Sequence, residues 1–239
     1  MKLAALTDVG NIRKINEDSF KTEAKDKYAY AIVADGMGGH LAGEVASQMA
    51  VDKIAEYVDG HMDDEFDRFQ VMEVLHQAFI YANDCIYKYS CENESVMGMG
   101  TTATMCMVRG GFVIFAHVGD SRAYMSGEKL IQITRDHSYV QELVKLGQIT
   151  PEEAKHHPRK NYITRAMGTE ESVKVDIGVK PYNGERLLLC SDGLIDEIED
   201  DSLQTLINDG TPQECAQRLV QLAKDNGGND NITAVIIGD

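Results

Sequence analysis

Apolar residues recur at helical spacing in three segments of this chain. The first segment spans residues 46–57, the second and longest spans residues 71–89, and the third spans residues 215–222. The repeating positions are Ala46, Ala50, Ile54 and Tyr57; Val71, Leu75, Ala78, Ala82, Ile86 and Tyr89; and Cys215, Leu219 and Leu222. A spacing of three to four residues places these side chains on one helix face, so the pattern predicts three amphipathic helices.

Short apolar or β-branched runs lie between and around these helices. They cover residues 28–33, 101–108, 112–118, 187–190 and 232–237. Gly110 and Gly111 separate two of these runs at hairpin distance, and residues 126–129 separate two further strands around Ala123 and Ile131. Strands joined by tight turns pair antiparallel, so the pattern predicts an α+β fold and not an alternating α/β fold.

Residues 138–165 differ from the rest of the chain because they contain many charged residues and histidines. A lid or insertion beside a functional site has this composition. A solvated helical hairpin has it equally well, and composition alone does not separate the two.

The chain has 239 residues, of which 43% are hydrophobic and 26% charged, and it fits one large domain or two small ones. Its formal net charge of -16 argues against nucleic acid or an anionic membrane as a partner, since both select basic surfaces. The excess acid serves solubility, or some of the carboxylates gather around cations.

The cysteines and the lack of long apolar runs indicate in which cellular compartment the protein works. Five cysteines form an odd set without a C-x-x-C spacing, which favours buried free thiols in a reducing compartment. Asp8 interrupts the N-terminal apolar residues, and no apolar run of about 18 residues occurs. We therefore expect a cytoplasmic protein that does not insert into membranes.

Four aspartates stand at the ends of predicted strands. Asp35, Asp120 and Asp192 follow strand runs, and Asp230 precedes the last one. Each alone fits an ordinary turn. Four carboxylates at one rim of a sheet would repel each other unless cations neutralised them, and oxygen ligands of this kind suit magnesium or manganese better than zinc.

Two further segments carry candidate chemistry. Residues 35–40 read Asp-Gly-Met-Gly-Gly-His at a strand-to-helix junction, where the Gly36 carbonyl could face a metal or the glycines could form only a tight turn. The spacing is not that of a dinucleotide fingerprint. Arg13 lies close to Glu17 and Asp18, and its guanidinium could grip a phosphate or form a surface salt bridge.

Together these strings resemble the type 2C protein phosphatases, the metal-dependent (PPM) serine/threonine phosphatases, in their compact bacterial form. The matching strings are Arg13 with residues 16–18, and residues 34–40, 99–102, 118–122, 134–138, 163–168, 190–194 and 229–233. The resemblance extends from about residue 5 to the last predicted strand, and motifs in this number and order are highly specific.

The resemblance implies a four-layer α-β-β-α sandwich with two central antiparallel sheets. It implies one catalytic domain over residues 1–239 with a flap over about 138–165, which favours the lid interpretation of that segment.

The resemblance also assigns site residues. Asp35 would bridge two metal ions, with the Gly36 carbonyl, Asp192 and Asp230 as further ligands. Asp120 with Asp192 would form a weaker third metal site. Glu17 and Asp18 would act through metal-bound water, Arg13 would grip the phosphate, and His40 would be the general acid, unless it only caps the following helix.

The implied activity is hydrolysis of phosphoserine and phosphothreonine in proteins, by a hydroxide that bridges two Mn²⁺ or Mg²⁺ ions and attacks phosphorus in line. The implied partners are phosphoproteins, including a serine/threonine kinase such as one with PASTA repeats, and we expect a monomer that binds no nucleic acid. Two alternatives stay open, a phosphoprotein-binding scaffold without turnover and a hydrolase of small phosphate esters or nucleotides.

Overall fold

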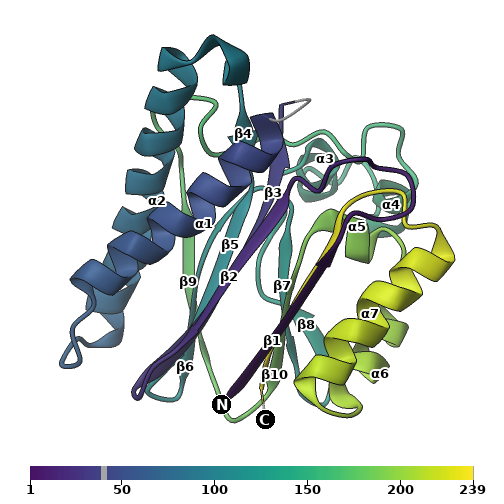
Figure 1. Cartoon of the computed structure of the whole chain (residues 1–239). Helices are drawn as coiled ribbons and strands as arrows, with labels where there is room; N and C mark the ends of the chain where they lie inside the picture. The colour runs from purple at the N-terminus through teal and green to yellow at the C-terminus, as the bar shows by residue number, and fades with distance from the viewer. Residues whose placement is uncertain (39–41, 239) are drawn as a thin grey trace.

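Two antiparallel sheets pack face to face in the computed structural model, which describes residues 1–38 and 42–238 (Figure 1). In spatial order, the first sheet contains β1 (Lys2–Asp8), β11 (Ile232–Gly238), β10 (Arg186–Cys190), β7 (Arg122–Ser126) and β8 (Leu130–Gln132). The second contains β2 (Asp18–Ala24), β3 (Tyr28–Met37), β5 (Ala103–Arg109), β6 (Phe112–Val118) and β9 (Asp176–Pro181), and the short β4 (Gly100–Thr101) pairs with the end of β3.

Helices cover the outer faces of both sheets (Figure 1). The second sheet is covered by α1 (Ala42–His61) and α2 (Arg68–Glu92), and the first by α6 (Asp200–Asn208) and α7 (Pro212–Asn226). Shorter helices are η1 (Glu94–Val96), α3 (Tyr139–Lys145), α4 (Pro151–Lys155) and α5 (Asp192–Ile195). The predicted α+β sandwich with four layers is therefore confirmed.

Capping boxes in the sequence explain where two of the longer helices begin. Asp67 accepts hydrogen bonds from the first-turn amides of α2, and Gln70 accepts one from the Asp67 amide in return. Thr211 and Glu214 form the same reciprocal pair at the start of α7. These bonds satisfy amides that have no partner inside the helix.

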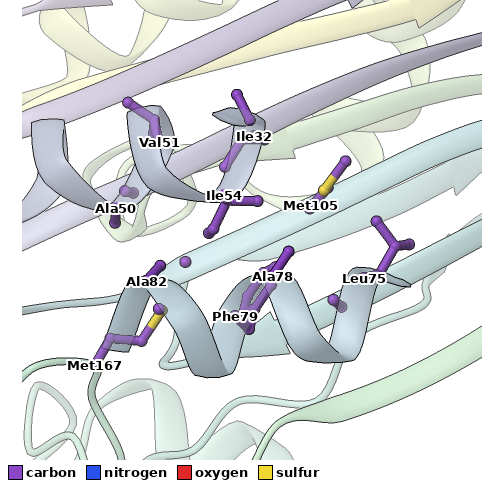
Figure 2. Packing of buried hydrophobic residues seen from close by; sticks show 14 of the residues in the cluster. Ile32, Ala50, Val51, Ile54, Leu75, Ala78, Phe79, Ala82, Met105 and Met167 are labelled. Carbon is purple, nitrogen blue, oxygen red and sulfur yellow. The ribbon is translucent and has the colours of Figure 1, made fainter. Parts of the chain in front are cut away.

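Apolar side chains form one layer between the sheets and one under each pair of helices. Val33 and Phe115 of the second sheet pack in one cluster with Leu189 and Val235 of the first. Figure 2 shows the layer beneath α1 and α2, where Ile54 and Phe79 face the strands that carry Ile32 and Met105. Burial on this scale is the main favourable term in folding.

The sequence pattern located most of these elements but missed several, including the short η1 and α5. The run 112–118 coincides with β6, and the run 101–108 is divided into β4 and β5 at Thr102. The pattern did not predict β1, β2, β9 or α6. The missed strands carry polar side chains and are only partly buried, so they lack the continuous apolar signal of the central strands.

Two expectations about surface exposure need correction. Cys106, Cys190 and Cys215 are buried free thiols as expected, but Cys91 is exposed and Cys85 is half-buried on α2. Tyr89, which the helical spacing placed on the apolar face of α2, is 42% exposed because the buried face continues from Ile86 to Ser90. Among the described residues, no helix is both long and apolar enough to cross a bilayer.

The buried face of α2 predicts an asymmetric response to truncation. Leu75 is fully buried, so Leu75→Ala should destabilise the protein by about 2–5 kcal/mol in urea unfolding through lost apolar contacts and the cavity left behind. Tyr89→Ala on the same helix is the matched control and should cost less than about 1 kcal/mol. Equal losses from the two variants would contradict this assignment of the buried face.

Candidate active site

Carboxylates from both sheets gather at one edge of the sandwich. Asp18 and Asp35 are directly opposite each other in the β2–β3 pairing. Asp120 follows β6, Asp192 begins α5 directly after β10, and Asp230 precedes β11. Burial raises the pKa of Asp35 well above its usual value, and the negative charges of the other four aspartates raise it further. The structure therefore brings together all the aspartates that the sequence predicted for one site.

Two threonines hold the backbone of Asp35 in place. The Asp35 amide donates to Thr102 Oγ1 over 2.9 Å. Its carbonyl accepts from the Thr102 amide over 2.9 Å and from Thr101 Oγ1 over 2.9 Å. Thr102 Oγ1 also bonds Ser121 Oγ at 2.7 Å, so the end of β3 is linked to the residue after Asp120.

Gly36 occupies a position with no room for a side chain. A Cβ built there would lie 2.0 Å from the Gly43 carbonyl oxygen of α1 and 2.7 Å from that of Glu17. The Gly36 amide donates to the Glu17 carbonyl over 3.0 Å. Glycine is required here because α1 and the residues before β2 approach the end of β3 closely.

Asp18 joins the two sheets through its side chain. Its Oδ2 accepts hydrogen bonds from Ser191 Oγ at 2.7 Å and Thr233 Oγ1 at 2.6 Å, both on the opposite sheet. Its Oδ1 is buried without a hydrogen-bond partner. Burial raises the pKa of Asp18 to about 7, although the two hydroxyl donors act in the opposite direction.

Asp120 and Asp192 have similarly perturbed carboxyl groups. Asp120 is buried, its Oδ1 has no hydrogen-bond partner, and burial raises its pKa well above the usual value. Burial, followed by the charges of Asp230 and Asp196, raises the pKa of Asp192 to about 6. The Asp192 carboxyl lies within hydrogen-bonding reach of Asp35, which lowers that pKa in part.

Arg13 lies at the rim of this carboxylate cluster. Its Nη2 is 2.7 Å from Asp230 Oδ2, and the two side chains are 49% and 34% exposed. This hydrogen bond raises the pKa of Arg13, and the charges of Asp230, Glu17 and Asp192 act in the same direction. Arg13 therefore forms the expected salt bridge, and its role in phosphate binding stays a prediction.

Glu17 is the sixth acid of this group. Burial raises the pKa of its carboxyl, and the Arg13 charge lowers it. Its Oε1 is buried without a hydrogen-bond partner. Asn231 fixes the backbone here, since its Oδ1 accepts from the Glu17 amide at 2.8 Å and its Nδ2 donates to the Ile15 carbonyl at 3.0 Å.

The sequence analysis assigned no role to four of the residues that orient this cluster. They are Thr102, Ser191, Asn231 and Thr233, all of which lie in the motif strings. The available signal was their position beside the strand-end aspartates, because short polar side chains there can bond neighbouring backbone or carboxylate groups. The predicted general acid, His40, lies outside the described residues.

The donor atoms fit a divalent metal centre. Glu17, Asp18 and Asp120 each present a buried carboxylate oxygen without a hydrogen-bond partner, an arrangement that is costly unless a cation or water satisfies it. Oxygen donors suit magnesium or manganese, which bind through few carboxylates and keep several waters. In the part of the chain that the structure describes, no three Asp, Glu, His or Cys side chains already form a closed metal-binding group. The buried carboxylate oxygens of this cluster are donors of the kind that magnesium and manganese bind.

Comparison with known proteins gives consistent matches. The family model for protein phosphatase 2C matches residues 13–233. The serine/threonine phosphatase Stp of Listeria innocua is 39% identical over 239 residues, which cover 97% of this chain and 93% of that protein. The serine/threonine protein phosphatase PstP of Mycobacterium tuberculosis is 38% identical over 99% of this chain, but the match spans only 44% of PstP.

Solved structures agree with these sequence matches. The crystal structure of serine/threonine phosphatase Stp1 from Staphylococcus aureus has a TM-score of 0.93 at 38% identity, covering 100% of this chain and 94% of that one. The catalytic domain of PstP in complex with two manganese ions has a TM-score of 0.85 at 36% identity, covering 98% and 96%. The extent of these matches shows that the chain belongs to the protein phosphatase 2C family.

Proposed function

We propose that this chain hydrolyses phosphoserine and phosphothreonine in proteins with the help of two divalent cations, Mn²⁺ or Mg²⁺. The observation that carries the proposal is the gathering of Asp18, Asp35, Asp120, Asp192 and Asp230 at one edge. Two of these acids, Asp18 and Asp120, have a buried oxygen without a hydrogen-bond partner. The curated relatives named above are serine/threonine phosphatases, and the PstP structure contains two manganese ions.

In this proposal the two ions would be held by Asp35, shared between them, and by the Gly36 carbonyl, Asp192 and Asp230. Asp120 with Asp192 would hold a weaker third ion. Bound divalent cations supply a nucleophilic water at neutral pH and neutralise charge on the phosphate. Asp18 and Glu17 hold and orient water next to the ions through the oxygens that lack a hydrogen-bond partner.

Arg13 binds the non-bridging oxygens of the phosphate. Its guanidinium presents paired donors that match a phosphate, and it is half exposed at the rim of the cluster. Its bond to Asp230 restrains the side chain there in the absence of substrate. The role of His40 as the proton donor to the leaving serine or threonine oxygen stays a prediction, which a comparison of good and poor leaving groups would test.

The wider assignments rest on the family resemblance. We propose a single catalytic domain, a cytoplasmic location, a monomeric state and substrates that include a serine/threonine kinase.

Removal of a proposed metal ligand tests the function. Asp192→Asn should lower the manganese-dependent rate on a phosphothreonine peptide by roughly 100-fold or more, because a ligand of the core ions is lost. Asp225→Asn, an exposed carboxylate on α7, is the charge-matched control and should retain the wild-type rate. A fully active Asp192→Asn variant would exclude this site. Wild-type turnover of aryl phosphates without any turnover of phosphopeptides would indicate a small-ester hydrolase.

Arg13 should act mainly through substrate binding. Arg13→Ala should raise KM for a phosphopeptide by about tenfold, the size expected for a lost hydrogen bond to a charged group. Arg13→Lys should recover only part of that loss, since lysine cannot bind two phosphate oxygens in the same plane. Unchanged kcat and KM in both variants would show that Arg13 forms only a structural salt bridge and does not bind substrate.

The raised carboxyl pKa values predict how pH affects the metal-free protein. A carboxyl whose pKa is higher in the folded state stabilises the fold at low pH, and this stability is lost as pH rises through the folded-state pKa. For Asp18 and Asp192 these values are about 7 and about 6. The melting temperature in EDTA should therefore fall between about pH 6.5 and pH 8.5.

The range from pH 6.5 to pH 8.5 avoids a second effect, the protonation of His117. Burial lowers the pKa of His117 to about 3, so its contribution is lost only as pH falls below the unfolded value near 6.5. Added manganese should abolish the fall in melting temperature at high pH, and Asp18→Asn should reduce that fall. A melting temperature that is constant or rises over this range in EDTA would contradict the prediction.

A further inference from the structure

A cavity of about 560 Å³ adjoins the carboxylate cluster. Asp120 and Asp192 lie at its inner end, and its walls come from the flap segment, residues 138–165, and from the segment 192–200 that forms α5 and the start of α6. Figure 1 shows α3 and α4 of the flap segment close to α5 at this edge of the sandwich. The volume falls within the usual range of ligand pockets, about 300–1,000 Å³.

The walls of the cavity carry an apolar surface. It is formed by Val140, Val144, Ala154, Ile195 and Ile198, which come from both sides. Such a surface can bind the methylene stem of a long side chain whose charged end stays near water.

Arg122 does not make this cavity an anion site, because its charge is already compensated. Its Nε lies 3.0 and 2.9 Å from the two carboxylate oxygens of Asp136, and its Nη2 lies 2.7 Å from Asp136 Oδ2. Gln132 and Tyr124 complete this network. The bidentate pair leaves little capacity to bind a further anion.

The remaining charges at the cavity are mainly negative. Lys160 pairs with Asp196 at 2.6 Å, and Lys155 pairs with Glu199 at the longer distance of 3.5 Å. Glu199 is 82% exposed and Lys155 45% exposed, so their pair is weak and open to exchange. Glu197 and Asp200 add acid on the same wall.

Asp120 links this cavity to the proposed metal site. Asp120 is 7% exposed and lines the inner end, where its Oδ1 has no hydrogen-bond partner. The cavity is thus lined by an unsatisfied buried carboxylate, by apolar side chains and by exposed acids.

We propose that this cavity is a subsite for an arginine or lysine side chain that lies near the phosphorylated residue of the substrate. The inference rests on the proposed function, since it places the phosphate at the carboxylate cluster. The side-chain stem packs between Val144 and Ile198, and its cationic end replaces Lys155 beside Glu199 and Asp200. The enzyme therefore prefers phosphopeptides with a basic residue close to the phosphate.

The test compares phosphothreonine peptides in which a single arginine, alanine or glutamate moves along the positions around the phosphorylated residue. At the position that reaches the cavity, wild-type enzyme should show kcat/KM about fivefold higher for arginine than for alanine, and the preference should shrink with added salt. Glu199→Gln and Asp200→Asn should each reduce the arginine preference, and the double variant should abolish it.

Asp201→Asn is the matched control, since Asp201 is also exposed in the first turn of α6 but does not line the cavity. It should keep the full arginine preference. All variants should hydrolyse p-nitrophenyl phosphate at the wild-type rate, because that substrate has no flanking residue.

The outcomes separate the subsite from the proposed function. Turnover of phosphopeptides without any preference for arginine, or with a preference for glutamate, would overturn the subsite while the phosphatase assignment stands. An equal loss of preference in Asp201→Asn would also overturn it, since the effect would then be one of general charge. Failure to hydrolyse any phosphopeptide would overturn the proposed function itself.

Discussion

The repulsion between buried carboxylates is the constraint on which the rest of this site depends. Burial and like charges together raise the pKa values of Asp18, Asp35, Asp120 and Asp192. A protein of marginal stability cannot gather ionised carboxylates in this way unless something compensates their charge. Protons can do so in the metal-free chain, and divalent cations can do so in the functional state that we propose. The same interaction therefore links stability to cation binding.

Uncharged hydrogen-bonding groups keep the carboxylates in position against this repulsion. Thr102 holds the backbone of Asp35, while Ser191 and Thr233 hold the side chain of Asp18 from the opposite sheet. These groups add no net charge, so they orient the acids without replacing a cation. They also join the two sheets at the edge where the apolar layer between them ends. The same hydrogen bonds therefore stabilise the sandwich and position the site.

Part of the negative charge of the chain is concentrated at this edge of the sandwich. The net charge is -16, and several of the acidic residues line the cavity that adjoins the carboxylate cluster. The lysines of the flap segment compensate only some of it. In our proposal the cations and the phosphate occupy the inner end, and the exposed acids select a positively charged neighbour. Asp192 at the start of α5 would then serve catalysis, and Asp200 at the start of α6 would serve selectivity.

The sequence by itself determined which strands are central, where the three longest helices lie, and which aspartates stand at strand ends. These features depend on local spacing, because a buried strand or an amphipathic helix repeats its apolar residues over a few positions. Only the tertiary structure decided that the half-exposed strands β1 and β2 pair with β11 and β3, and that Arg13 contacts Asp230, 217 residues away. It also decided that Ser191 and Thr233 act on Asp18, and that the flap segment and α5 enclose a cavity. Such contacts arise from the packing of two sheets, and no local pattern of side chains encodes which distant residues that packing brings together.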